Sequence, residues 1–396
     1  MKILKQKFLT LTLFLISGIA TFIWTFWRFK FGSNAFWDFR VYTRAVADSQ
    51  LGLNPYQSRT ELPFMYHPYI LELLVKIDNF VPISIFLSSL YILCSVFFFL
   101  SLIQFLKLDN LNNIDTFRKL SLIIVLSLGL GGSSLVAFVS GNVSTLLHLL
   151  IAGIFFQIQQ KYSRKKVGAF LVSIAFATLI KPYFALYLFL LPIFFGISTS
   201  LFLSGTSILG VILLWMSGKI LYPLLYSDFI EKVRFVTIER GDLGFSAFSI
   251  LKRRLGEPLA LTLHLSLVAL LLFLVFFISQ KYLLTIRETL LWYFPLPFAI
   301  ITFTNPRLKE YDLVISVLLM VAWLIFRGGK SGEIALLTSF VLFLSRTILF
   351  LLQNPLNIKI HDSLIYLKYW EFLTLLMLIV WMLYIPPKQL FAKKHF

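Results

Sequence analysis

Asp38 is a carboxylate whose position allows two kinds of chemistry. It stands between an apolar stretch and a segment, residues 39–51, whose spacing predicts a helix. As an N-cap, its carboxylate would accept hydrogen bonds from the backbone N–H groups of that helix. As a functional group, it would act as a general base or as a metal ligand. The sequence leaves both interpretations open.

The helix predicted at residues 39–51 is amphipathic. Apolar side chains such as Tyr42 and Val46 lie on one stripe, and Gly52 is a typical C-terminal stop. An amphipathic helix next to an apolar stretch is typical of a helix that lies along a membrane surface. We therefore expect Asp38 to lie at the boundary of the bilayer.

Four later residues have the chemistry of a phosphate site. Lys181 lies between two short apolar segments, while Arg307, Lys309 and Tyr311 share one tight turn. A lysine or arginine at the end of a membrane span often extends its charge to the interface and does nothing more. Two cations and a tyrosine in one turn favour phosphate binding. For Lys181 both interpretations stay open.

The sequence predicts no metal site and no nucleotide site. His148 and His264 are single histidines inside apolar runs, and neither has metal-ligand spacing to another histidine or to a cysteine. Cys94 is the only cysteine, so no disulfide can form within the chain. A Gly-rich phosphate loop is also missing, which argues against a nucleotide-driven pump.

The composition shows what must position these residues. Of 396 residues, 59% are hydrophobic and 14% are charged, and the mean hydropathy is +0.86. An ordinary soluble domain has about 25% charged residues. So few charges exclude both a water-soluble fold of this size and a disordered chain. The sequence predicts an all-α, polytopic transmembrane helix bundle that forms a single integral-membrane domain over residues 1–396.

The apolar runs predict about twelve spans, and we interpret the first as a retained span because it is long and has no small-residue cleavage site. The pair at 167–180 and 183–198 is short for spanning. The predicted spans are residues 8–27, 82–106, 120–139, 143–159, 167–180, 183–198, 200–217, 259–279, 289–304, 312–326, 333–352 and 369–385.

Basic residues predict the orientation. The short loops on the side of the N-terminus carry 17 Lys and Arg residues, and the short loops on the other side carry five. The positive-inside rule then puts both termini in the cytoplasm and two long loops, residues 28–81 and 218–258, on the outer face. We expect interfacial helices in both. The second long loop is either a solvated face or a surface that binds an acceptor or lipid heads.

The net charge of +18 indicates which kinds of partner the protein could bind. In a soluble protein such a charge would raise the question of nucleic acid. In a membrane protein, basic loops hold the cytoplasmic side and meet anionic lipid heads. Membrane lipid is therefore the expected partner, and no nucleic acid is expected.

Three segments of the first outer loop resemble a known family. They read Asp-Phe-Arg-Val-Tyr at residues 38–42, Leu-Gly-Leu-Asn-Pro-Tyr at 51–56 and Phe-Met-Tyr-His-Pro-Tyr at 64–69. This pattern resembles the first outer loop of glycosyltransferase family 87, whose members are polytopic enzymes of the GT-C type.

Three later segments match that family in the same order. Residues 141–144 resemble its Gly-Gln turn, residues 181–183 its Lys-Pro turn and residues 305–312 its late outer loop. One departure is that Asn142 stands where the family has a longer glutamine. The late loop also lacks the paired histidine of the family.

The resemblance implies a GT-C-like bundle that transfers a sugar, mannose or another hexose, from a polyprenyl-phosphate donor to a glycan or glycolipid acceptor on the outer face. We expect no cofactor, and we expect a bacterial inner (plasma) membrane as the location. Asp38 takes the place of the catalytic base. Phosphate binding falls to Lys181, Arg307, Lys309 and Tyr311, and substrate binding to Arg40, Tyr42, Asn54, Tyr56, Tyr66, His67 and Asn142.

Two alternatives remain. A transporter or flippase of a lipid-linked glycan would handle the same lipid without forming a bond. Such proteins tend to show internal repeats, and the two halves of this chain show no convincing repeat. An inactive scaffold of the same fold is the second alternative, because a fold does not guarantee a function.

Overall fold

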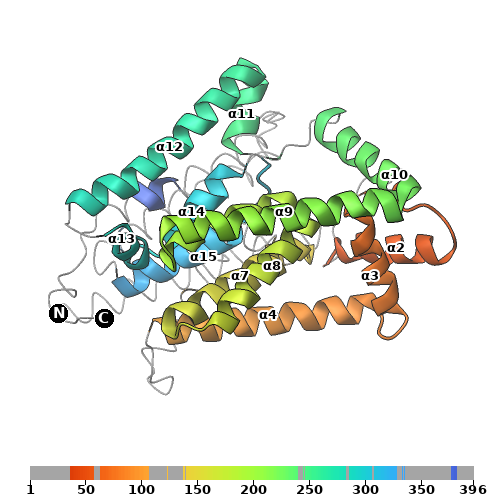
Figure 1. Ribbon diagram of the computed structural model, residues 1–396, viewed down its shortest axis with the longest axis horizontal. Helices are drawn as coiled ribbons and strands as arrows, with labels where there is room; N and C mark the ends of the chain where they lie inside the picture. The colour runs from red at the N-terminus through yellow and green to blue at the C-terminus, as the bar shows by residue number, and fades with distance from the viewer. Residues whose placement is uncertain are drawn as a thin grey trace, which may run out of the picture. The chain divides into compact units, whose positions relative to one another are not determined.

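The computed structural model is all-helical in the residues that it describes, as the sequence predicts (Figure 1). No strand occurs among those residues. The described residues are 36–57, 63–106, 123, 137–138, 140–239, 244, 246–281, 285–305, 307–327, 332, 334 and 376–380.

Four of the described helices are long and apolar enough to cross a membrane, which identifies a membrane protein. They correspond to the spans predicted at 82–106, 143–159, 200–217 and 259–279, and their ends differ from the prediction by a few residues. The four helices are α4 (Ile83–Phe105), α7 (Val143–Gln160), α9 (Ile197–Leu221) and α12 (Glu257–Lys281).

The short pair predicted at 167–180 and 183–198 forms α8 (Arg164–Ile180) and η1 (Pro182–Ile193). The second element is a 3₁₀-helix, which is unusual at 12 residues. A 3₁₀-helix rises about 2.0 Å per residue, so η1 extends about 24 Å, whereas an α-helix of the same length extends about 18 Å. The tighter winding therefore lengthens a segment that looked too short to span.

The span predicted at 289–304 is not one helix. It divides into α13 (Ile286–Trp292) and α14 (Pro295–Thr304). Pro295 has no backbone N–H to continue the first helix and instead starts the second, where a missing N–H costs nothing. The next predicted span, 312–326, is α15 (Glu310–Arg327).

The remaining predicted spans lie almost entirely outside the described residues, and so do both termini. The total of twelve spans and the cytoplasmic termini therefore stay predictions. These spans are residues 8–27, 120–139, 333–352 and 369–385.

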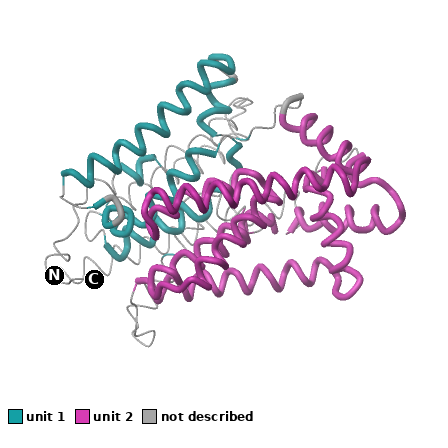
Figure 2. Tube along the Cα trace, in the orientation of Figure 1, with its two compact units in different colours: residues 1–31, 110–136, 244–396 teal, residues 32–109, 137–243 magenta. Residues whose placement is uncertain are grey.

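The chain divides into two compact units (Figure 2). One unit contains residues 32–109 and 137–243, and with them Asp38 and Lys181. We call it the Asp38 unit. The other contains residues 1–31, 110–136 and 244–396, and includes α11 (Ala247–Leu255) and α12 to α15.

Within the Asp38 unit, α7 is the central helix and packs against both α4 and α8 (Figure 1). In an 18-residue apolar stretch of α7, 67% of the residues are buried inside the protein, whereas the corresponding share in α9 is 11%. Phe155 and Phe156 of α7 are fully buried. We infer that α9 presents most of its apolar side chains to lipid, while α7 belongs to the protein core.

Both long loops contain helices, and the placement of these helices at a membrane interface stays a prediction. The first carries α2 (Phe39–Gln50) and α3 (Pro68–Asp78), and Gly52, just after the end of α2, has a φ of 73°. The second carries α10 (Pro223–Arg234) and a π-helical turn, η2 (Phe235–Glu239), before α11.

The apolar stripe of α2 is buried inside the Asp38 unit. Phe39, Tyr42 and Val46 are between 2% and 6% exposed, and α2 packs against α3 and α4. The apolar side of α2 therefore packs against protein, and a position of this helix along the membrane surface stays a prediction.

Candidate functional site

Asp38 is fixed by both its backbone and its side chain. Its N–H donates to the carbonyl oxygen of Ser140 over 2.9 Å, and its Oδ2 accepts from Nδ2 of Asn142 over 2.8 Å. Asp38 does precede α2, but its side chain makes no capping hydrogen bond to that helix. The capping interpretation is therefore wrong, and the carboxylate is directed instead at a residue 104 positions later.

Asn142 connects Asp38 to Lys181. Its Oδ1 accepts from Nζ of Lys181 over 3.2 Å and from the N–H of Ser144 over 2.9 Å. An ammonium and a backbone N–H can only donate, so both contacts require the oxygen of the amide on their side. The nitrogen must then face the carboxylate. One buried amide thus holds the carboxylate and the cation at its two ends.

Gly141 allows this turn to form. Its φ is 71°, a conformation that costs other residues about 1–2 kcal/mol. A Cβ at this position would lie 2.7 Å from the ring of Phe39 and 2.9 Å from the ring of Phe36. The rings of Phe36 and Phe39 therefore pack directly against the turn that carries Asn142.

The N-terminus of α7 completes the arrangement. Asn142 is its N-cap, and the hydroxyl of Tyr42 accepts from the N–H of Val143 over 3.2 Å. Tyr91 of α4 donates to the carbonyl oxygen of Asn142 over 2.7 Å. The positive end of the helix dipole lies at this point, and it favours a carboxylate or a phosphate nearby.

Tyr42 and Tyr66 form a buried pair, with their hydroxyl oxygens 3.0 Å apart. Burial raises the pKa of the Tyr42 phenol well above its usual value, and the neighbouring Tyr66 and Asp38 raise it further. Tyr42 therefore stays protonated at neutral pH. It orients neighbouring groups by hydrogen bonds and does not serve as a base.

Asn54 and Tyr56 lie in a second group of residues. Oδ1 of Asn54 accepts from the N–H of Tyr56 over 3.0 Å, which closes a local turn. The Tyr56 hydroxyl donates to the carbonyl oxygen of Tyr66 over 2.7 Å. Tyr56 is only 1% exposed, and burial raises its pKa. These contacts give Asn54 and Tyr56 a role in holding the first loop together.

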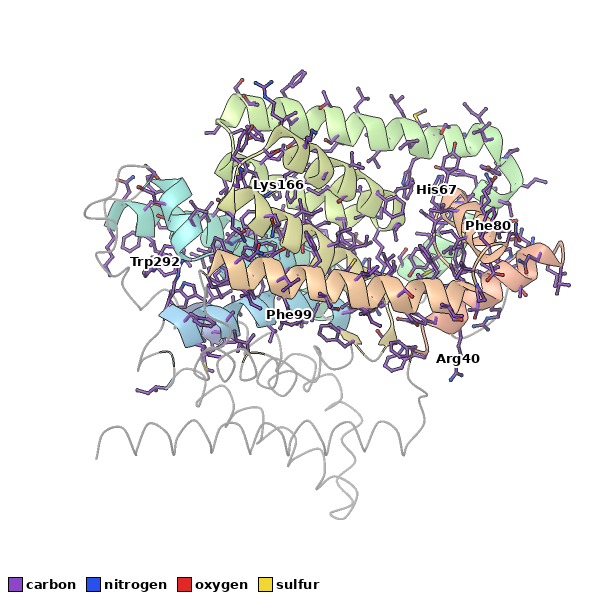
Figure 3. All side chains as sticks on the ribbon, turned by 90° about the horizontal axis from the view of Figure 1, so that it is seen from below. Arg40, His67, Phe80, Phe99, Lys166 and Trp292 are labelled. Atoms are coloured by element: carbon purple, nitrogen blue, oxygen red, sulfur yellow. The ribbon has the colours of Figure 1, made fainter. Side chains whose placement is uncertain are left out.

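His67 is enclosed rather than open to a substrate. It is fully buried, and Nδ1 accepts from the N–H of Tyr69 over 3.3 Å at the start of α3 (Figure 3). Burial lowers its pKa, so the ring is neutral. The ring contacts Tyr69, Trp215, Tyr226 and Phe229, and a Cβ on Gly218 would collide with it.

The predicted site residues thus fall into separate places. The structure brings together Asp38, Tyr42, Tyr66, Asn142 and Lys181. Arg40 is exposed and points away from the helices of this unit (Figure 3). The second group, Asn54, Tyr56 and His67, packs around the loop.

Arg307, Lys309 and Tyr311 belong to the other compact unit, in the turn between α14 and α15 and at the start of α15. The N–H of Arg307 donates to Oδ1 of Asn305, and the N–H of Lys309 donates to Oδ2 of Asp312, each over 3.0 Å. These contacts define the turn. The role of its cations in phosphate binding stays a prediction.

Sequence reasoning missed Asp228 of α10, which accepts from Asn54 over 2.5 Å. It was one of several carboxylates in the second long loop, and nothing in the local sequence sets it apart. His148 also has a partner that the sequence did not indicate: its Nδ1 lies 2.6 Å from the hydroxyl of Tyr187 on η1. Among the residues described, no three His, Cys, Asp or Glu side chains are placed to hold a metal ion.

The site offers a carboxylate that can accept a proton, a cation that can bind an anion, and an amide that fixes both. Comparisons with protein-family models, with curated proteins and with solved structures find no match for this chain. A function must therefore be inferred from the chemistry of the site.

Proposed function

We propose that the protein is a membrane glycosyltransferase of the GT-C type, similar to glycosyltransferase family 87. It transfers a hexose, mannose or another, from a polyprenyl-phosphate donor to a glycan or glycolipid acceptor on the outer face of the membrane. The observation that supports this most is the hydrogen-bonded series from Asp38 through Asn142 to Lys181. A carboxylate and an ammonium thus lie on the two sides of one amide. In the proposed function they act as the base and as the phosphate-binding cation.

In the proposed reaction, an acceptor hydroxyl oxygen forms a bond to the anomeric carbon of the donor sugar. The bond between that carbon and the phosphate oxygen breaks, and polyprenyl phosphate leaves with the bonding electron pair. Asp38 takes the proton of the attacking hydroxyl. Lys181 stabilises the negative charge that grows on the leaving phosphate. No atom changes its oxidation state in a way that needs an oxidant or a reductant.

The length of Asn142 supports this division of roles. The base must reach the attacking hydroxyl and the cation must reach the leaving phosphate of one anomeric centre, so the two groups must lie close together without forming a direct ion pair. Asn142 holds the carboxylate at its nitrogen and the ammonium at its oxygen, with contacts of 2.8 Å and 3.2 Å. The N-terminus of α7 adds its positive dipole end to the same place.

The proposal includes a topology. About twelve spans, both termini in the cytoplasm and residues 218–258 on the outer face put Asp38 where a lipid-linked donor is presented, in a bacterial inner membrane. Reporter fusions at residue 396 and within residues 218–258 should report opposite faces. If both positions report the same face, this topology is wrong.

A transporter or flippase of a lipid-linked glycan is the second candidate. One observation favours it: the chain leaves α-helical geometry at Lys181 and continues as the 3₁₀-helix η1. Interrupted helices beside a charged residue are typical of transporter binding sites. This candidate assigns phosphate binding to Lys181 but gives Asp38 no proton to accept.

The deciding experiment measures transfer from a radiolabelled polyprenyl-phosphate hexose in membranes that express the chain, with vector membranes as the control. A glycosyltransferase moves the label into a new glycosidic product. A flippase moves the labelled lipid across the bilayer and leaves its bond intact. Failure to form product from any hexose donor, in membranes shown to contain the folded protein, would rule out the proposed transfer.

A further inference from the structure

The two long loops are joined by a carboxylate in the Asp38 unit. Asp228 of α10 lies in the second loop, and its Oδ2 accepts from Nδ2 of Asn54 over 2.5 Å and from Nε2 of Gln57 over 3.5 Å. Both donors belong to the turn that follows α2 in the first loop. The neighbouring Phe229 is 2% exposed and packs on the ring of Tyr56.

From this turn, hydrogen bonds continue to the site itself. The N–H of Tyr56 donates to Oδ1 of Asn54, and the Tyr56 hydroxyl donates to the carbonyl oxygen of Tyr66. The hydroxyl of Tyr66 meets that of Tyr42. Tyr42 in turn accepts from Val143, the residue directly after Asn142.

We infer that Asp228 is a positioning residue for Asp38, and that the second outer loop is part of the machinery of the site. Asp228 fixes the Asn54 turn, and that turn fixes the tyrosines on which the N-terminus of α7 rests. This inference deepens the proposed function and rests on it. It assigns a role to a segment whose charges otherwise look like a solvated face.

The chemistry of Asp228 suits this role. Its carboxylate accepts from two side-chain amides at once, and hydrogen bonds to a charged group are stronger than those between neutral groups. Oδ1 of Asn54 accepts from the N–H of Tyr56, and Nδ2 of the same side chain donates to Asp228. Removing the carboxylate leaves a part-buried donor without this acceptor, which loosens the turn from the side of α10.

The first test compares three variants of the full-length protein in membranes: Asp228→Ala, Asp228→Asn and Glu231→Ala. Glu231 is exposed on the same helix, one turn later, and serves as the matched control. We expect Asp228→Ala to lower kcat about 10-fold with little change in KM, because misplacing a reactive group costs rate. Asp228→Asn keeps an acceptor oxygen for Asn54 and should retain most of the activity, and Glu231→Ala should match the wild type.

The second test asks whether Asp228 acts through the tyrosines. Tyr66→Phe removes the hydroxyl that meets Tyr42 and leaves the carbonyl oxygen in place. If the two residues belong to one series, Asp228→Ala should cost clearly less in kcat when Tyr66 is already Phe. Effects that simply multiply would overturn the inference, as would an Asp228→Ala variant with wild-type kcat.

A third measurement does not depend on activity. In hydrogen exchange, Asp228→Ala should speed exchange in peptides that cover residues 54–57 and 64–69, and leave α8 unchanged. Unchanged exchange in the first loop would overturn the inference even if transfer is observed. Faster exchange in a protein that shows no transfer would instead count against the proposed function and leave the structural link intact.

Discussion

The Asp38 carboxylate lies 2.8 Å from the side-chain nitrogen of Asn142, and the oxygen of the same amide lies 3.2 Å from the ammonium of Lys181. Asn142 is 5% exposed, whereas its contacts with the two charged groups are part-buried. Asn142 therefore has two separate duties. It caps α7 through Ser144, and it orients the two charged groups of the site.

Two substitutions at Asn142 should separate these duties. Asp and Ser are both good N-caps, so either should keep α7 within about 1 kcal/mol of the wild type. Asn142→Asp adds a second carboxylate beside Asp38. The repulsion between the two negative charges makes it easier to protonate the Asp38 carboxylate. We expect the acid limb of the pH–rate profile to move to higher pH. Asn142→Ser is too short to bridge and should lower kcat without that displacement.

The measurement is the pH dependence of kcat/KM in membranes with equal amounts of folded protein. Asn142→Gln carries the same amide as the family pattern and should recover part of the activity. If all three variants lose stability and activity in parallel, Asn142 is only a structural cap.

Asp38→Asn should abolish transfer and leave folding intact. The new amide oxygen can still accept from Asn142, and Asp38 makes no side-chain cap to α2, so the local structure loses little. It cannot take a proton from an acceptor hydroxyl. A general base typically contributes about 10²–10⁴-fold in rate. Asp48→Asn, on the same helix, is the control, and near-normal activity of Asp38→Asn would mean that the base lies elsewhere.

The sequence predicted the helices better than the site. The sequence predicts a helix at residues 39–51, and α2 ends at Gln50, one residue earlier. Gly52, with its positive φ, follows the C-cap Leu51 and accounts for the end of the helix at this place. Long apolar runs predicted α4, α7, α9 and α12 well, since burial in protein or lipid depends mainly on composition over a long window. The break before Pro295 was missed, because proline can either start a helix or interrupt one.

The partners within the site could not be predicted. Asp38 meets Asn142 because its backbone N–H is bound to Ser140, and that pairing depends on how α2 packs against the start of α7. No local pattern contains this information. The resemblance did single out Asn142 and Lys181, but as substrate and phosphate contacts rather than as partners of each other.

Gly141→Ala should destabilise the protein more than Gly52→Ala. Both glycines have positive φ, 71° and 73°, so alanine costs about 1–2 kcal/mol of backbone strain at each. At Gly52 a Cβ meets nothing within 4 Å, whereas at Gly141 it collides with Phe39 and Phe36. Thermal unfolding in detergent should show a larger fall in Tm for Gly141→Ala. Equal shifts would mean that the two rings move aside freely.

His67 should make stability depend on pH. Burial lowers its pKa in the folded protein below the value of about 6.5 expected for an unfolded chain. Below pH 6.5 the unfolded chain therefore binds more protons, and stability should fall as the pH drops from 7 to 5. Asn can replace the capping acceptor at this position and does not titrate. The Tm of His67→Asn should fall less over this range, and an equal fall in both proteins would assign the effect to other groups.

Lys181 should matter through its charge. Lys181 and Lys165 lie at the two ends of α8, and Lys165 is exposed, so the same change to glutamine at each position compares a site cation with a surface cation. We expect Lys181→Gln to raise KM for the donor and to lower kcat, because both the bound phosphate and the leaving phosphate lose a counter-charge. Lys181→Arg should be milder, and Lys165→Gln should have no effect.

The same assay tests the predicted role of Arg307 and Lys309. If these cations hold the donor phosphate together with Lys181, the loss from Arg307→Gln should be smaller once Lys181 is already glutamine, since one phosphate is shared. Residues that act independently give losses in free energy that add within about 0.3–0.5 kcal/mol. Additive losses for both pairs would restrict the phosphate site to the Asp38 unit and remove Arg307 and Lys309 from it. Losses that fall short of additivity by more than about 1 kcal/mol would place all three cations around one phosphate.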